Sequence, residues 1–387
     1  MENQKAIHVV YLITKLELGG AQKICLELFD GLGPYGVKTT LITGATGDLI
    51  EKATPLRTIF LPTLKRELSL FGFMHEVRTF LHLIVLFKTL KNEHRQLIVH
   101  THSSKAGILG RFAALFAGIA IRVHTIHGYA FHTYQHPIVW LITYMIELMA
   151  SQVTTHFICV SLADAQIGKR LFPGFSKRHS LIRAAVNFQQ FSHISVCAPA
   201  ILTNVKNPFV FGTIACFKPQ KNLLDLLCAF KILYKQFQYA RLEIIGDGIM
   251  RTQLMDWINK NNMQHVVTLH GWQKNVISFM QRWHAFALSS LWEGLPCAVV
   301  EARLLKLPIV SYRTGGIPEI IKDGHNGFLC EPKDYTTLAV QMAKLMTDSD
   351  LYVRMRTYVD ILGDFQMEYM LDQHYALYRR LAHTKEQ

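Results

Sequence analysis

Residues 289–324 have the sequence SSLWEGLPCAVVEARLLKLPIVSYRTGGIPEIIKDG, in which short apolar runs alternate with loops that contain glycine and proline. This pattern predicts a strand, a loop, a helix and a second strand, which is the repeating unit of a parallel α/β sheet. The loop from Trp292 to Pro296 would follow the carboxyl end of a strand, where open parallel sheets bind ligands. The stretch therefore predicts an α/β fold and the position of a ligand site.

The start of the predicted helix is suited to an anion. Pro296 is expected in the first turn, where proline is favoured because its missing N–H would have no partner. The amides of Cys297 and Ala298 would then point beyond the helix end. Such a terminus carries about half a positive charge and favours a phosphate group.

Two glutamates flank this helix start. Glu293 lies in the loop, and Glu301 follows eight positions later on the helix face that carries Ala298 and Leu305. A carboxylate on such a face is costly to bury unless donors surround it. One interpretation is that Glu301 accepts hydrogen bonds from sugar hydroxyls while Glu293 lines a reacting pocket. The alternative is a capped helix whose carboxylate pairs with a neighbouring lysine.

The spaced glutamates, followed by TGGIPEIIKDGHNGFL at residues 314–329, resemble the signature of the family 4 retaining glycosyltransferases. The resemblance extends from Gly19 to about Leu381. It implies the GT-B fold, in which two Rossmann-like α/β domains face each other across a cleft. It also implies that Glu301 binds the ribose of a nucleotide and Glu293 the donor sugar, while the diphosphate meets the segment of Leu295, Pro296, Cys297 and Ala298.

The composition is that of a globular protein with room for two domains. Half of the 387 residues are apolar and 18% are charged, and no segment has the roughly 20 consecutive apolar residues that span a bilayer. The N-terminus lacks a basic region and a cleavage site, which predicts a first strand and a cytoplasmic location. Seven scattered cysteines without a CxxC pair argue against a disulfide framework and a zinc site.

The net charge of +13 is uneven, with +9 in residues 1–195 and +4 in the remainder. A basic first half predicts an anionic partner. Nucleic acid is not expected, because no recognition motif accompanies the charge. An anionic membrane surface fits better, and the protein would bind peripherally to the inner face of the plasma membrane. The alternative is a solvated basic face. The basic residues beside apolar segments (Leu68–Phe73 and Leu81–Phe87) are Lys65, Arg66, Arg78, Lys88 and Lys91.

Three parts are expected along the chain. An N-terminal acceptor-binding Rossmann-like domain would cover residues 1–195, and a nucleotide-sugar-binding Rossmann-like domain residues 196–365. A linker is predicted between Asn187 and Pro208, where the periodicity fades. A last helix within residues 366–387 is expected to cross back to the first domain, as in the resembled fold.

Three strand ends of the first domain carry candidate site residues. Gly19 and Gly20 follow the first strand, and a glycine pair there would allow a backbone that other residues cannot adopt, although any tight turn could use glycine. Polar residues follow two later strands, at positions where a crevice would lie. These residues are His102, Ser103 and Lys105 after one strand and His127 after the other.

The resemblance assigns roles to these residues. Gly20 would approach the donor phosphate, Gly19 the acceptor, and His127 would donate a hydrogen bond to the donor sugar. The acceptor would meet His102, Ser103 and Lys105. A lone histidine is more often structural than functional. His124, His132 and His136 also cluster here, but their irregular spacing argues against a zinc site.

The sequence of the second domain predicts further contacts with the donor substrate. Lys218 and Lys221 lie between a strand over Phe209–Phe217 and a helix, where two cations would bind a phosphate; two solvated loop lysines are the alternative. The resembled family usually has an arginine where Cys216 stands, and Lys218 would substitute for it.

Glycine-containing loops follow two more strands of this domain. Gly246 and Gly248 suit close packing, and Asp247 between them could bind a ligand or cap the next helix. In the resembled fold the nucleotide base lies near the position of Gly271.

The resemblance implies a retaining transferase. It would move a hexosyl or N-acetylhexosaminyl group from a nucleotide diphosphate sugar, with UDP expected, to a cell-envelope glycan or a lipid-linked acceptor. His127, Glu293 and Lys221 would be catalytic. No cofactor and no metal are expected, because lysines and a helix start would balance the diphosphate charge. Asp348 and Asp350 are expected to cap a helix.

Other classes share this architecture. Sugar-nucleotide epimerases and carbohydrate phosphorylases cannot be separated from it by fold alone. A non-catalytic sugar-nucleotide-binding protein is a further alternative, because Cys216 stands where arginine is usual.

Overall fold

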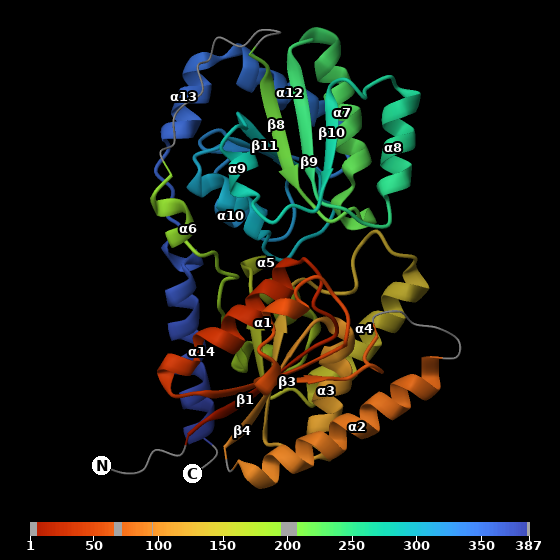
Figure 1. Cartoon of the computed structure of the whole chain (residues 1–387), viewed down its shortest axis with the longest axis vertical. Coiled ribbons are helices and arrows are strands. Elements are labelled where there is room, and N and C mark those ends of the chain that lie inside the picture. Colours follow the sequence, from red (N-terminus) through yellow and green to blue (C-terminus); the bar gives the residue numbers. More distant parts are fainter. Residues whose placement is uncertain (1–5, 66–71, 95, 195–206, 385–387) are drawn as a thin grey trace. The chain divides into compact units, whose positions relative to one another are not determined.

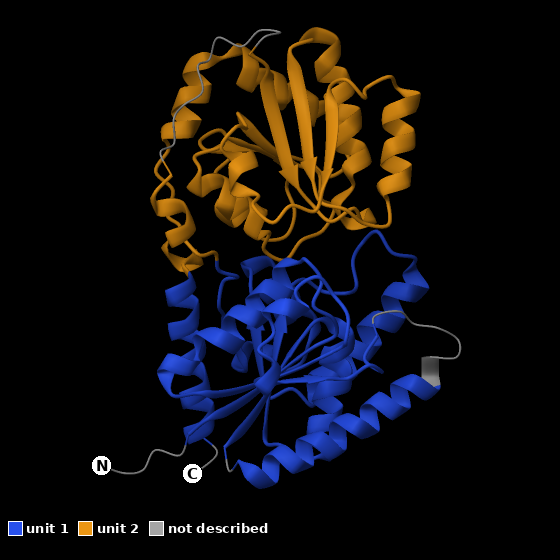
Figure 2. Ribbon diagram, in the orientation of Figure 1, with its two compact units in different colours: residues 1–185, 367–387 blue, residues 186–366 orange. Residues whose placement is uncertain are grey.

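A computed structural model of the chain describes residues 6–65, 72–94, 96–194 and 207–384. It divides into two compact units, one of residues 1–185 with 367–387 and the other of residues 186–366 (Figure 2). The domain boundary predicted at residue 195 lies outside the described residues, as do Arg66 and most of the apolar segment that follows it. Among the described residues, no helix combines the length and the apolar character needed to cross a membrane.

The first unit is a parallel sheet with helices packed against it (Figure 1). Its strand order is β3-β2-β1-β4-β5-β6-β7. The elements are β1 (His8–Ile13), α1 (Gly20–Gly31), β2 (Lys38–Thr43), β3 (Thr58–Phe60), α2 (Gly72–Glu93), β4 (Leu97–His102), α3 (Ser104–Phe116), β5 (Ile121–Ile126), α4 (Pro137–Gln152), β6 (His156–Cys159), α5 (Leu162–Leu171), β7 (His179–Leu181) and α14 (Met367–His383).

The second unit repeats this architecture with strand order β10-β9-β8-β11-β12-β13. Its elements are α6 (Gln189–Ser192), β8 (Phe209–Ile214), α7 (Leu223–Gln236), β9 (Ala240–Ile245), α8 (Arg251–Lys260), β10 (Val267–Gly271), α9 (Ile277–Met280), β11 (Ala285–Leu288), α10 (Cys297–Leu304), β12 (Ile309–Tyr312), α11 (Ile317–Ile320), β13 (Gly327–Cys330), α12 (Tyr335–Thr347) and α13 (Ser349–Thr357).

Each sheet reverses its strand order once, between β1 and β4 in the first unit and between β8 and β11 in the second. All six residues of β1 and of β4 are buried, as expected for central strands covered on both faces. At such a reversal the loops that leave the two strands diverge, and a crevice opens at their carboxyl ends. The topology therefore places one candidate site in each unit.

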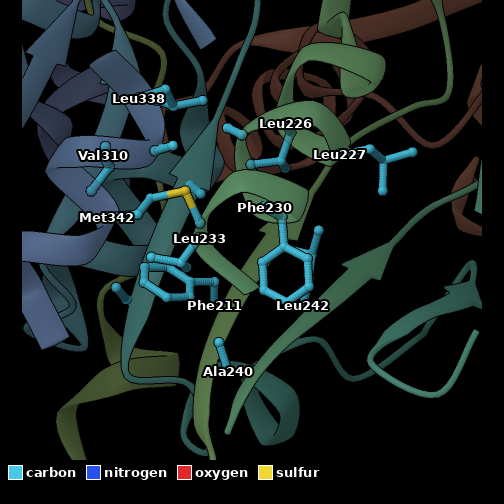
Figure 3. Close-up of a cluster of buried hydrophobic side chains, with 14 of the residues drawn as sticks. Phe211, Leu226, Leu227, Phe230, Leu233, Ala240, Leu242, Val310, Leu338 and Met342 are labelled. Carbon is cyan, nitrogen blue, oxygen red and sulfur yellow. The ribbon is translucent and has the colours of Figure 1, made fainter. Parts of the chain in front are cut away.

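The core of the second unit joins its sheet to two helices. Phe211 and Leu242 from the strands pack with Phe230 of α7 and Met342 of α12, and none of the four side chains is exposed (Figure 3). Burial of a side chain of this size contributes about 1.5–3 kcal/mol, so this cluster anchors α7 and α12 to the sheet.

The C-terminal helix α14 belongs to the first unit. The hydroxyl of Tyr35 donates to Asp372 at 2.6 Å, and the hydroxyls of Tyr11 and Tyr378 lie 3.2 Å apart. The end of the chain therefore contacts β1 and the segment that follows α1.

Candidate functional site

The reversal point of the second sheet joins the loops that follow β8 and β11. The hydroxyl of Ser289 donates to the carbonyl oxygens of Lys221 and Asn222, at 3.0 and 2.9 Å. The amide of Leu291 donates to the carbonyl oxygen of Gln220 at 2.8 Å. These bonds hold residues 220–222, which include the predicted phosphate-binding Lys221, against the start of the signature loop.

Two of the predicted catalytic residues meet at this junction. The ammonium group of Lys221 forms an ion pair with Oε1 of Glu293, and the two side chains are 18% and 7% exposed. Gln220 donates to Oε2 of Glu293 at 3.4 Å and to the carbonyl oxygen of Trp292 at 2.8 Å. A charge buried this far requires a partner, so each member of the pair fixes the position of the other. Gln220 is a site residue that sequence analysis missed, although it stands between two predicted lysines.

Helix α10 begins directly after this pair. Pro296 takes the N-cap position and not the first turn as predicted, because its ψ of 103° is extended and the helical backbone starts at Cys297. Leu295 is buried, and Glu301 is half-buried one turn into the helix. The predicted diphosphate and ribose residues thus lie along one short segment that leaves the Glu293 loop.

A third loop, after β12, supports the backbone of Glu293. Gly315 has φ +51°, and a Cβ atom there would lie 2.1 Å from the carbonyl oxygen of Glu293. The amide of Gly316 donates to the carbonyl oxygen of Gly294 at 2.7 Å. The hydroxyl of Thr314 donates to the carbonyl oxygen of Leu291 at 3.1 Å. The TGG of the signature is therefore a structural support for the glutamate loop, a role that sequence analysis did not assign.

The loop after β9 packs as closely as its glycines predict. Gly246 has φ +129°, and a Cβ atom there would lie 1.9 Å from the carbonyl oxygen of Ala215. Its amide donates to the carbonyl oxygen of Gly271 at 2.9 Å, which joins two predicted donor-binding residues. Asp247 accepts from the amide of Gly248 at 2.7 Å and pairs with Arg251 at 3.1 Å, so this carboxylate is held at the start of α8.

Cys216 and Lys218 lie in the loop that follows β8. Lys218 is the residue before the single 3₁₀ turn Pro219–Lys221, and both it and Cys216 are half-buried. Lys218 is therefore adjacent in the chain to the segment that carries Gln220 and Lys221.

In the first unit, the reversal point joins the ends of β1 and β4. The hydroxyls of Thr14 and Ser103 are hydrogen bonded at 2.8 Å. Ser103 has φ +63°, a backbone conformation that residues with a side chain rarely adopt and that concentrates at functional sites. The Ser103 hydroxyl is thus fixed at the N-terminus of α3.

Two histidines pair at the adjacent strand ends. Nδ1 of His102 lies 2.9 Å from Nε2 of His127. Burial lowers the pKa of His127 to about 3 and holds the pKa of His102 well below its usual range, so both rings are neutral near pH 7. The bond occupies Nε2 of His127, and Nδ1 of this ring has no hydrogen-bond partner among the described residues. His102 is fully buried, so it supports His127 and does not present a surface to an acceptor as sequence analysis predicted.

A network of buried rings continues behind this pair. The rings of His100 and His102 are 4.3 Å apart. His100 bonds through Nδ1 to the hydroxyl of Tyr378 at 2.6 Å and through Nε2 to Thr125 at 2.7 Å. Sequence analysis missed this support, because His100 and Tyr378 are 278 positions apart in the chain.

One prediction for the strand ends of the first unit differs from the structure. Gly19 has φ −153°, which is ordinary extended backbone, and Gly20 is the first helical residue of α1, so the expected need for glycine at this turn was wrong. Lys105, which is predicted to meet the acceptor, forms an ion pair with Glu76 of α2.

The clustered histidines of the first unit have separate partners. His124 bonds to Thr101 at 2.9 Å, and His136 accepts from the amide of Ile138 at the start of α4. Within residues 6–65, 72–94, 96–194 and 207–384, no three metal-binding side chains come together. Asp348 accepts from the amide of Leu351 at 2.8 Å, which confirms the predicted helix cap.

Two family models together match most of the chain. The family model described as Glycosyltransferase Family 4 matches residues 18–189, and the one described as Glycosyl transferases group 1 matches residues 198–360. The UDP-Gal:alpha-D-GlcNAc-diphosphoundecaprenol alpha-1,3-galactosyltransferase of Escherichia coli is 32% identical over 349 residues, which are 87% of each chain.

Two more distant similarities cover nearly the whole chain. The capsular polysaccharide biosynthesis glycosyltransferase CapM of Staphylococcus aureus is 21% identical over 91% of this chain and 90% of its own. The crystal structure of HepE from Anabaena in complex with UDP and glucose has a TM-score of 0.78 at 17% identity, over 97% of this chain and 100% of that one. At that identity the structural likeness concerns the fold alone.

Proposed function

We propose a specific reaction for this chain, which belongs to the family 4, group 1 glycosyltransferases. Its predicted fold class, GT-B with two Rossmann-like α/β domains, is confirmed by the two parallel sheets and the likeness to HepE. The reaction is transfer of a hexosyl or N-acetylhexosaminyl group from a UDP-linked sugar to a lipid-linked acceptor of the cell envelope, with retention of configuration.

The observation that carries this proposal is the junction of Lys221, Gln220 and Glu293 at the reversal point of the second sheet. Cleavage of the donor leaves negative charge on the UDP diphosphate. The ammonium of Lys221, with Lys218 nearby in the chain, and the N-terminus of α10 after Pro296 would stabilise that charge as it develops. With these groups in place, we propose that the reaction requires no metal and no cofactor.

The donor sugar would be held by Glu293, and the ribose by Glu301. His127 would donate from its ring to the sugar, because its other nitrogen is bonded to His102. We infer same-face attack, in which an oxygen of the leaving diphosphate takes the proton of the acceptor hydroxyl. Retention then follows without a covalent intermediate on the protein.

The acceptor proposal rests on the relative from Escherichia coli and on the charge of the chain. That relative is named for transfer of galactose to GlcNAc-diphosphoundecaprenol, so UDP-galactose and a GlcNAc-diphosphate-polyprenol are the first substrates to test. The +9 charge of residues 1–195 suits a diphosphate-linked lipid at an anionic membrane surface. Ser103 at the N-terminus of α3 would contact that acceptor.

The test is UDP, GDP and ADP release from a panel of nucleotide sugars, with and without a GlcNAc-diphosphate-polyprenol of short chain. We expect acceptor-dependent release from one UDP-sugar, an α-linked product by NMR, and unchanged rates in EDTA. Lys221→Ala should lose the activity, whereas Lys235→Ala, an exposed lysine of the same unit, should retain it. Donor conversion without acceptor would identify an epimerase, and binding without turnover a sugar-nucleotide-binding protein.

A further inference from the structure

The ion pair between Lys221 and Glu293 joins two residues that have different proposed ligands. Lys221 would bind the diphosphate of the donor, and Glu293 would bind its sugar. The ammonium of Lys221 contacts Oε1 of Glu293, and the two side chains are 18% and 7% exposed. While the pair is formed, the charge of Lys221 is balanced by the carboxylate. A diphosphate that uses this charge therefore competes with Glu293 for it.

The carboxylate of Glu293 depends on this lysine. Its other oxygen, Oε2, accepts from the side-chain amide of Gln220 at 3.4 Å, which is long for a hydrogen bond. The same amide donates to the carbonyl oxygen of Trp292 at 2.8 Å, so it is shared between two acceptors. A carboxylate this buried is strongly destabilised if its cation leaves and no other donor arrives. The hydroxyl groups of a sugar are donors of the required kind.

The backbone around Lys221 is fixed, whereas its side chain is flexible. The amide of Lys221 donates to the carbonyl oxygen of Lys218 at 3.0 Å, and its carbonyl oxygen accepts from the hydroxyl of Ser289 at 3.0 Å. Asn222, the next residue, has φ +44°, and its carbonyl oxygen accepts from the same hydroxyl at 2.9 Å. The four-carbon stem of a lysine can redirect its ammonium without moving the backbone. Lys221 can therefore change its partner while the loop stays in place.

We propose that Lys221 changes its partner from Glu293 to the diphosphate only when the sugar supplies a hydroxyl group to Glu293. When the intact UDP-sugar binds, the ammonium leaves Oε1 and a sugar hydroxyl takes its place there. UDP alone attracts the ammonium but brings no donor for Oε1, so part of its binding free energy is lost. The inference rests on the proposed function and deepens it, because it makes the pair a determinant of specificity for the intact donor.

The same exchange bears on release of the product. Once the sugar has moved to the acceptor, UDP remains on Lys221 while Oε1 has lost its hydroxyl donor. The carboxylate then competes again for the ammonium, which weakens the binding of UDP. The pair thus favours the substrate over the product at one position of the site.

A shared cation is the alternative. An ammonium has three N–H donors, so Lys221 could contact Glu293 and the diphosphate at the same time. In that arrangement a sugar hydroxyl on Glu293 would not change the availability of Lys221, and loss of the carboxylate would not improve UDP binding. Exchange predicts the opposite in both cases, because the sugar and the loss of the carboxylate each release the ammonium.

Calorimetry with UDP separates the two arrangements and requires no acceptor. UDP is titrated into wild-type protein alone and with an excess of free galactose, glucose or N-acetylglucosamine, and sorbitol is the control for a nonspecific polyol effect. We expect one of these sugars to raise the affinity for UDP about fivefold, since it supplies the hydroxyl that releases Lys221. This measurement uses the unaltered chain, so it does not depend on the folding of a variant.

Two carboxylate variants test the role of Glu293. Glu293→Gln keeps the shape of the side chain but no longer holds Lys221 by charge. It should bind UDP about fivefold more tightly than wild type and respond less than about twofold to the sugar. Asp247→Asn is the matched control, because it removes another carboxylate of this unit, one that pairs with Arg251 at 3.1 Å. It should keep the wild-type response to the sugar, and circular dichroism and thermal melting show that both variants are folded.

The results distinguish a failure of the exchange from a failure of the proposed function. A wild-type UDP affinity that none of the three sugars changes overturns the exchange alone. A folded Glu293→Gln variant that binds UDP no better than wild type does the same. Failure of wild type to bind UDP at all would overturn the proposed UDP-dependent reaction, and the exchange with it.

Discussion

The Nδ1 atom of His102 lies 2.9 Å from the Nε2 atom of His127, at the carboxyl ends of adjacent strands β4 and β5. Because burial keeps both rings neutral, one donates and the other accepts, and the bond selects the tautomer of His127. His102 is thus a positioning residue for a histidine that would contact the donor sugar.

Removal of His102 should affect turnover more than binding. We expect His102→Leu to lower kcat about tenfold with little change in the donor KM, because His127 loses the bond that orients it. His102→Gln, which keeps a hydrogen-bonding amide, should recover part of the loss. Steady-state kinetics with UDP-sugar check this, and equal activity of both variants with wild type would rule out the positioning role.

The roles proposed for Glu301 and His127 separate in the same assay. Glu301→Ala should weaken UDP binding about tenfold or more, since a charged hydrogen bond to ribose contributes about 1.5–3 kcal/mol. His127→Ala should leave UDP affinity unchanged and lower kcat. Calorimetry with UDP and single-turnover kinetics distinguish the two effects. Two fully active variants would disprove the site assignment.

The Lys221–Glu293 pair should matter for stability as well as activity. Lys221→Met leaves a carboxylate that is 7% exposed without its cation, and we expect a loss of about 3 kcal/mol in the free energy of unfolding. Adding Glu293→Gln removes the uncompensated charge and should restore most of that stability without restoring activity. Urea unfolding of the single and double variants measures the coupling, and additive losses would argue against the pair.

Gly315 offers a structural test of the loop that supports Glu293. Gly315→Ala should destabilise the protein by at least about 2 kcal/mol and weaken donor binding, because its Cβ would overlap the carbonyl oxygen of Glu293 in a left-handed backbone. Gly324→Ala is the matched control, with φ +76° and no atom within 4 Å of the added Cβ. We expect about 1 kcal/mol from backbone strain alone there, with donor affinity unchanged.

The sequence predicted the local part of this site well. Apolar runs separated by glycine and proline determine where strands end, so residues 218–221 and 292–296 were expected at the carboxyl edge of a sheet, where the structure has them. The contact between Lys221 and Glu293 could not be predicted, because it depends on β8 and β11 being neighbours although β9 and β10 separate them in the chain.

Other features depend on contacts that no local pattern contains. The supporting bond from His100 to Tyr378 joins β4 to the last helix. The glycine pair at residues 19 and 20 shows a second limit of sequence analysis. Its position correctly predicts the turn, but Gly19 has an extended φ of −153° that other residues could adopt. Residue type at a strand end therefore indicates a loop more reliably than it indicates the backbone of that loop.

The buried histidines predict a steep loss of stability in acid. Burial lowers the pKa of His374 to about 4 and that of His127 to about 3, and it holds those of His100, His102 and His124 well below their usual range. Below pH 6.5 the unfolded chain binds protons at these five positions and the folded chain does not, so the stability contributed by these histidines is full above pH 6.5 and falls as the pH drops toward 4. Each histidine contributes up to about 1.4 kcal/mol per pH unit to the pH dependence of the free energy of unfolding. Asp164, whose pKa burial raises to about 7, offsets the contribution of about one histidine.

Urea unfolding at pH 7.5, 6.5 and 5.5 should therefore show a falling midpoint. His124→Gln, which can keep a bond to Thr101, should reduce the pH dependence of stability by about the contribution of one histidine. A midpoint that stays constant from pH 7.5 to 5.5 would mean that these rings are not held neutral by burial.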